Sequence, residues 1–153
     1  MQATDWLVGG TGTSDAPECV DPCLRGFAIK LNDSRVFAEW RDELKPFAAR
    51  LANTNQGVAL TKKRVFACAD WAVREIAPLA LEKRHPESAA RLRAVPEIVD
   101  ESTALAARTV AQAASAAAYA AADAAAYAGD RPVWDAALAF LGRLCDMSSE
   151  VRA

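Results

Sequence analysis

The stretch ALAARTVAQAASAAAYAAADAAAYA (residues 104–128) decides the fold class of this chain. Sixteen of its 25 residues are alanine, the strongest helix former, and Gly129 follows at the place where a helix commonly ends. Because alanine side chains are short, neighbouring helices can approach such a helix closely on most of its sides. We therefore expect a long alanine-rich helix at the centre of an all-α fold.

One polar stripe marks this small-residue helix. Its members follow one another at steps of three or four residues, which places them on one line along the helix surface. Tyrosine joins a rigid ring to a hydroxyl group and is enriched at protein interfaces. The stripe is therefore either a solvated edge or a partner-binding face, and the candidate binding residues are Arg108, Gln112, Tyr119, Asp123 and Tyr127.

Helical patterns also cover most of the chain outside this stretch. Asp21-Pro22 begins a short helix as N-cap and first residue, and apolar residues recur at helical spacing over 34–52, 61–84, 87–94 and from residue 131 onward. Pro46 should kink or divide the second of these helices, and Pro78 should bend the third. We predict a compact single-domain bundle of five to six helices over 21–148, with a loop-rich N-terminal arm (1–20) and a frayed tail (149–153).

Composition narrows the classes of function. The 153 residues carry a net charge of −2, which gives no basic face for a nucleic acid. No run approaches the roughly 20 apolar residues of a membrane span, and the N-terminus lacks a secretory signal. With four cysteines and no export signal, reduced thiols in a cytoplasmic protein are expected.

Few residues suggest catalysis or metal binding. The chain has one histidine, His85, and no cysteine pair at zinc-ligand spacing, so we predict no catalytic residue, metal or cofactor. Cys23 follows Cys19 by four residues and lies in a first helical turn, where the helix dipole favours a thiolate; it is either a reactive thiol or a structural residue. Asp70 has Arg64 and Arg74 as candidate partners, and we predict a structural ion pair with Arg74.

Two segments resemble a known family. Arg64-Val65-Phe66-Ala67-Cys68-Ala69-Asp70-Trp71-Ala72-Val73-Arg74, followed by Pro78 and Glu82, and the Ala-Tyr-Ala-Ala-Ala-Asp pattern of residues 116–128 are similar to alanine-rich putative bacterial immunity proteins. The resemblance covers about residues 58–128, whereas the arm before residue 57 does not align. It implies a helical protein that neutralises a toxin by binding it.

We therefore expect a binding protein that acts on a protein partner by steric occlusion. The alternatives are another helical adaptor or inhibitor, such as a phage-borne inhibitor of a host defence complex, a small-molecule binder and a thiol-redox protein. A small-molecule pocket would be lined by aromatic residues from several helices: Trp40, Trp71, Tyr119, Tyr127 and Trp134. An exposed alanine face would also favour a homo-oligomer.

Overall fold

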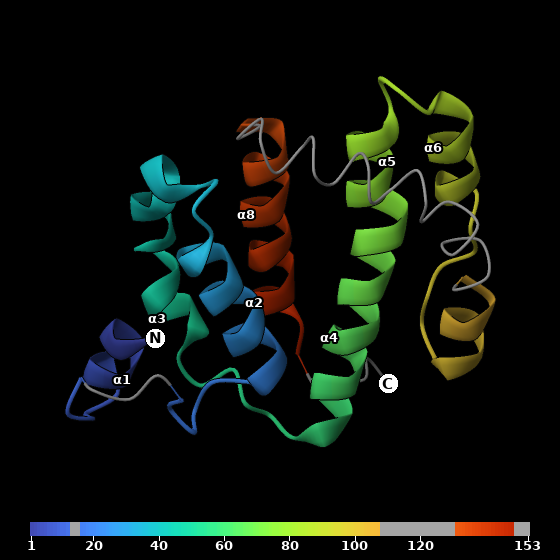
Figure 1. The fold of residues 1–153 in the computed structure, drawn as a ribbon. Helices are drawn as coiled ribbons and strands as arrows, with labels where there is room; N and C mark the ends of the chain where they lie inside the picture. The colour runs from blue at the N-terminus through green and yellow to red at the C-terminus, as the bar shows by residue number, and fades with distance from the viewer. Residues whose placement is uncertain (13–15, 108–130, 149–153) are drawn as a thin grey trace. The chain divides into compact units, whose positions relative to one another are not determined.

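All regular structure in the described part of the chain is helical (Figure 1). The computed structural model describes residues 1–12, 16–107 and 131–148. The predicted all-α class is confirmed, although these ranges hold more helical segments than the five to six predicted. No helix among these residues is long and apolar enough to span a membrane.

Contacts divide the chain into two compact units. Unit 1 comprises residues 1–64 and 137–153, and unit 2 comprises residues 65–136. The helical elements within the described ranges include α1 (Gln2–Leu7), α2 (Pro22–Asp33), the 3₁₀ helix η1 (Ala38–Leu44), α3 (Phe47–Leu51), α4 (Val58–Trp71), the π-helix η2 (Ala72–Ile76), α5 (Ala77–Leu81), α6 (Pro86–Arg93) and α8 (Arg131–Asp146). Residues 101–107 are helical as well.

In unit 1, α2 begins as its sequence predicts. The Asp21 carboxylate accepts hydrogen bonds from the backbone N–H groups of Cys23 and Leu24, and Pro22 occupies the first turn. Residues 34–52 do divide at Pro46, the N-cap of α3, but the part before the proline is a 3₁₀ helix that begins only at Ala38. Ser34 is extended and ends α2, and the apolar residues that follow form η1 and then α3 after Pro46.

The N-terminal arm contains a helix that its sequence did not predict. Helix α1 precedes the glycine-rich segment, and the buried side chain of Asp5 lies against that segment. Asp5 Oδ2 accepts a hydrogen bond from the Gly12 N–H at 3.0 Å. A Cβ atom on Gly10 would lie 2.4 Å from Asp5 Oδ1, so any larger residue would displace the Asp5 carboxylate. The glycines thus shape a turn around a carboxylate.

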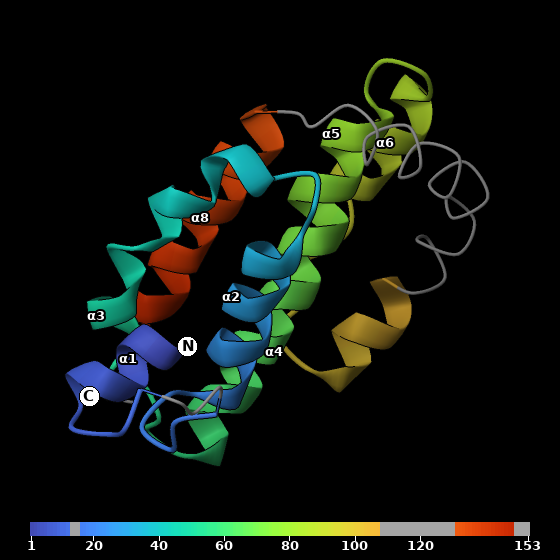
Figure 2. The same ribbon diagram turned by 60° about the vertical axis from the view of Figure 1, so that its left-hand side comes forward.

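The core of unit 1 lies where α2, α3 and the 137–146 part of α8 meet (Figures 1 and 2). The rings of Phe27 and Phe140 meet edge to face with 5.5 Å between their centroids. Arg50 on α3 donates to the Gly142 carbonyl and pairs with Asp146. The buried apolar side chains of this unit are Val20, Leu24, Ala28, Leu31, Leu51, Leu60, Ala137, Phe140, Leu141 and Leu144.

In unit 2 a continuous helical path changes its winding before Pro78. The Ala77 N–H bonds to the Ala72 carbonyl, five residues back, as in a π-helix. Pro78 has no N–H to offer the carbonyl of Arg74, so the backbone widens one turn earlier. The structure thus shows a π-turn at η2 directly before Pro78, and the bend predicted at Pro78 stays a prediction.

Helices α5 and α6 lie side by side in both ribbon views (Figures 1 and 2). Leu81, Ala89 and Leu92 form a buried cluster between them, with Val73 and Ala77 at its edge. A second cluster joins α4 to the segment that follows α6. Its members are Val95, Ile98 and Ala107, packed by Phe66, Ala69, Val73 and Ala104.

Candidate functional site

The polar stripe lies outside the described residues. Arg108, Gln112, Tyr119, Asp123 and Tyr127 all fall within 108–130, so the partner-binding role predicted for them stays a prediction. The other candidate sites lie within the described residues of the two units.

Asp70 is the central polar side chain of unit 2. Arg74 Nη1 lies 3.0 Å from Asp70 Oδ1, which is the pairing that their four-residue spacing predicts. Asp70 Oδ1 also accepts a hydrogen bond of 2.9 Å from the Ile98 backbone N–H. Since Ile98 is buried in the second cluster, Asp70 fixes the chain just before the helix over residues 101–107.

Asp100 caps that helix. Its Oδ1 accepts hydrogen bonds from the Thr103 N–H at 2.8 Å and from the Ser102 hydroxyl at 2.8 Å. The Thr103 hydroxyl in turn accepts from the Asp100 N–H. The Thr103 N–H, followed by the Ser102 and Thr103 hydroxyls, lowers the pKa of Asp100 to about 2. The carboxylate therefore stays charged at any physiological pH.

Around this cap, apolar and acidic side chains share an exposed surface. Val99 is 57% exposed and Leu105 is 66% exposed, and Glu97, Asp100 and Glu101 are exposed beside them. Glu101 and Leu105 are four residues apart in one helix and so share a face. We name these five residues the acidic–apolar segment. The buried side chain of Ile98 attaches this segment to the cluster with Val95 and Ala107. The segment exposes carboxylates and branched apolar side chains together.

The Glu82 carboxylate of the family-like motif also has a partner. It forms an ion pair with Arg93, which connects the end of α5 to the end of α6. The hydrogen bond from Arg93 lowers the pKa of Glu82. Pro78 and Glu82 of this motif therefore have structural roles in unit 2. Pro78 follows the π-turn at η2, and Glu82 joins the end of α5 to the end of α6.

Unit 1 contains a buried charged pair that its sequence did not reveal. Arg64 Nη1 lies 2.9 Å from Asp21 Oδ2, and both side chains are fully buried. The remaining guanidinium contacts go to backbone carbonyls, from Nε to Leu144, from Nη1 to Thr54 and from Nη2 to Met147. Because protein groups surround this arginine, we assign it a structural role. It binds α8 and the residue 54 turn to the N-terminus of α2.

The Asp21 carboxylate is held in its charged form. Burial raises its pKa, but hydrogen bonds from Thr61, Arg64 and the Leu24 N–H, together with the Arg64 charge, outweigh burial and lower it overall. The Thr61 hydroxyl donates to Asp21 Oδ2 at 2.7 Å. Arg64, one of the two predicted partners for Asp70, is thus committed to Asp21.

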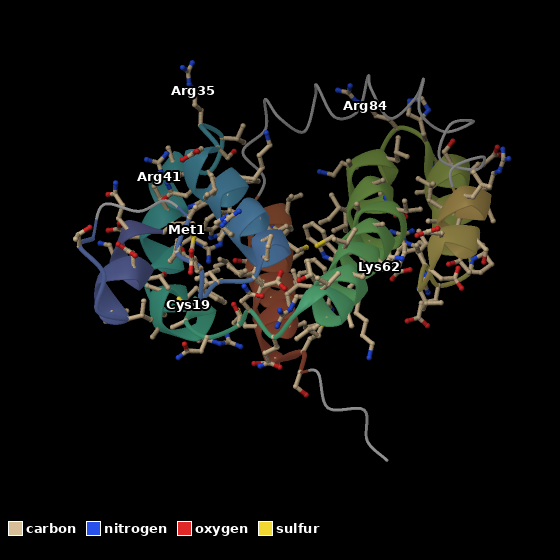
Figure 3. All side chains as sticks on the ribbon, turned by 90° about the horizontal axis from the view of Figure 1, so that it is seen from below. Met1, Cys19, Arg35, Arg41, Lys62 and Arg84 are labelled. Atoms are coloured by element: carbon tan, nitrogen blue, oxygen red, sulfur yellow. The ribbon has the colours of Figure 1, made fainter. Side chains whose placement is uncertain are left out.

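A cavity of about 350 Å³ opens in unit 1. Elements α1, α2, η1 and α3 contribute most of its walls, with Leu141 of α8. Its lining contains none of the tryptophans that could have marked a small-molecule pocket. Figure 3 labels two residues that line it, Met1 and Arg41. The full lining is Met1, Ala3, Thr4, Ala28, Ile29, Asn32, Asp33, Arg41, Asp42, Leu44, Lys45, Phe47, Ala48, Leu51 and Leu141.

The four cysteines, all within the described residues, form no disulfide. Cys19, Cys23, Cys68 and Cys145 are each half-buried, and Cys23 lies in the first turn of α2 beside the Asp21 carboxylate. Burial raises the pKa of the Cys145 thiol. Among the residues that the structure describes, no three potential ligands from histidine, cysteine and carboxylates gather as a metal site would require.

Sequence reasoning identified some of these groups and missed others. The spacing of Asp70 and Arg74 was sufficient to pair them. The Asp21–Arg64 pair joins residues 43 positions apart and leaves no local signal. Arg64 directly follows Lys62 and Lys63, so in the sequence it looks like one of several solvated cations. Comparisons with protein-family models, with curated proteins and with solved structures find no match to this chain.

Proposed function

We propose that this chain is an immunity-type protein, which neutralises a toxin by binding it and covering its working surface. In this proposal unit 2 supplies the contact through the acidic–apolar segment. The partner is a basic protein, such as a nuclease whose substrate is itself an anion. The chain contributes no chemistry to the neutralisation.

The observation that carries the proposal is the exposure of Val99 and Leu105 among three carboxylates. Exposed branched side chains lose contact with water when a partner covers them, which is the main source of binding energy in interfaces. The surrounding carboxylates attract a basic surface and accelerate its association. Because the Asp70–Ile98 hydrogen bond already orders this segment, little conformational entropy is lost on binding.

The family resemblance also supports unit 2 as the part of the chain that contacts the partner. It covers about residues 58–128, and unit 2 spans residues 65–136. Of the residues that carry the resemblance, Phe66, Ala69 and Val73 pack against the cluster that contains Ile98, next to the acidic–apolar segment. A binding surface carried by the family-like part of the chain is what an immunity protein requires.

The proposal is tested by identifying the partner and measuring growth. The tagged chain is used to capture a partner from its native host, and the partner gene is then expressed elsewhere with and without this chain. We expect the partner alone to stop growth and the co-expressed chain to restore it. A partner that is not toxic, such as a component of a defence complex, would contradict the immunity proposal and favour the inhibitor alternative. The gene neighbourhood adds a rapid check, since an immunity gene lies beside its toxin gene.

Matched variants locate the contact. Leu105→Ala and Val99→Ala should each weaken the captured complex by about tenfold, as loss of a central apolar contact does. Val58→Ala is the control, because Val58 is 84% exposed and belongs to unit 1. Glu101→Lys should slow association, whereas Glu39→Lys in unit 1 should not. If the unit 1 variants weaken or slow binding as much as the unit 2 variants do, the acidic–apolar segment is not the contact.

A further inference from the structure

The unit 1 cavity has the construction of a small-molecule site and is separate from the partner surface proposed in unit 2. Its volume of about 350 Å³ falls within the range of roughly 300–1,000 Å³ that is usual for ligand pockets. Its walls are apolar, with Leu44, Phe47, Leu51 and Leu141 among them. Leu51 and Leu141 are buried, so the floor of the cavity belongs to the core of the unit.

Charged groups line the cavity beside these apolar walls, and most of them have partners within the protein. Lys45 Nζ lies 2.8 Å from Asp42 Oδ2 in an exposed ion pair. The Asp33 carboxylate accepts a hydrogen bond from the Asn32 amide at 3.0 Å. Arg41 is exposed, and its guanidinium has no ion pair or hydrogen bond with the residues that the structure describes.

These features together define the chemistry of a ligand. An apolar body would be drawn into the cavity by burial of its surface. A carboxylate at one end would meet the planar fork of the Arg41 guanidinium, which binds carboxylates through two parallel hydrogen bonds. Asp33 and Asp42 would oppose a carboxylate, but both are already engaged by neighbouring donors.

We propose that unit 1 binds a medium-chain aliphatic carboxylate, with its hydrocarbon chain in the cavity and its carboxylate on Arg41. The leucine and alanine lining matches an aliphatic chain. This function is additional to the binding of a protein partner, because its residues belong to unit 1. A failure of one proposal therefore leaves the other intact.

The test uses the full chain labelled with ¹⁵N and titrated with decanoate at concentrations below micelle formation. We expect saturable shifts of amide resonances in α2, η1 and α3. Decylammonium and decanol are the matched probes, with the same hydrocarbon chain and a positive or neutral head. We expect decylammonium and decanol to bind more weakly than decanoate. Equal binding of all three, or the absence of saturable shifts with decanoate, would overturn the proposal.

Two variants assign the ends of the ligand. Arg41→Gln should weaken decanoate binding by about tenfold or more, as loss of a charge-assisted hydrogen bond does, and should leave decanol binding unchanged. Arg35→Gln is the control, since Arg35 is also exposed but does not line the cavity (Figure 3). Ala48→Leu narrows the cavity and should weaken the binding of both decanoate and decanol. If Arg41→Gln and Arg35→Gln have the same effect on decanoate, the carboxylate assignment is wrong.

Discussion

Replacing Arg64 by methionine should destabilise unit 1 more than any exposed charge removal. Arg64 has fully buried contacts with Asp21 and with the carbonyls of Thr54, Leu144 and Met147. Methionine fills part of the space but leaves the Asp21 carboxylate buried without its cation. Breaking one side of a buried pair costs about 3–5 kcal/mol, so we expect a loss of about 4 kcal/mol in the free energy of unfolding. That is a large part of the roughly 5–15 kcal/mol that stabilises most proteins.

The assay is equilibrium unfolding in urea, followed by far-ultraviolet circular dichroism. Lys45→Met is the control, because it removes a cation from an ion pair whose side chains are 73% and 82% exposed. That loss should stay below about 1 kcal/mol. Asp21→Asn should destabilise less than Arg64→Met, and the double variant should lose less than the sum of the two. If Arg64→Met is no worse than Lys45→Met, the structural role assigned to this pair is wrong.

The pH dependence of the same variants gives an independent check. The pKa of Asp21 is lower in the folded chain than its ordinary value of 3.8. The stabilisation by this carboxylate is therefore complete above pH 3.8 and declines as the pH falls below that value through the folded pKa. In Asp21→Asn this part of the acid sensitivity should vanish. An acid unfolding profile identical to that of the wild type would show that Asp21 does not contribute.

Further predictions concern Asp70, Asp100 and Cys145. Asp70→Asn should lower the stability of unit 2 by about 1–3 kcal/mol, since a charged hydrogen-bond acceptor for Arg74 and Ile98 is lost; hydrogen exchange of the Ile98 amide measures it. Asp100→Ala should fray the helix over 101–107, whereas Asp100→Ser should largely preserve it, and amide exchange in that helix distinguishes the two. The wild-type cap itself should weaken as the pH falls from 3.8 toward about 2, because the folded pKa of Asp100 lies below the ordinary one. Cys145 should react with iodoacetamide more slowly than a cysteine in an unstructured peptide, because burial raises its pKa; equal rates, read by mass spectrometry, would contradict its burial.

Local chemistry predicted much of this fold. Asp21 and Pro22 begin α2 as predicted, because capping and proline geometry act within a few residues, and the helix predicted over 87–94 is α6. The four-residue spacing of Asp70 and Arg74 placed both on one helix face. Apolar periodicity correctly indicated the helical class, although it missed α1 in the N-terminal arm.

Features that depend on distant residues could not be predicted in this way. The Asp21–Arg64 pair and the unit 1 cavity bring together segments far apart in the chain, and no sequence spacing encodes them. Periodicity also failed over 34–52, since an apolar spacing of three or four fits a 3₁₀ helix followed by a short α-helix as well as one long helix. In the candidate contact surface, Glu97, Asp100 and Glu101 lie at or just before the start of the helix over 101–107, where carboxylates complement the helix dipole. The exposure of Val99 and Leu105 required the structure.

Stoichiometric neutralisation of the captured toxin by purified chain tests the central claim most directly. The activity of a fixed amount of toxin is measured as increasing amounts of this chain are added. Steric occlusion predicts a linear loss of activity that is complete at one chain per toxin molecule, and full recovery of activity when the complex is dissociated. Inactivation by far less than one equivalent, or a toxin that stays inactive after separation, would show a catalytic action and contradict the account.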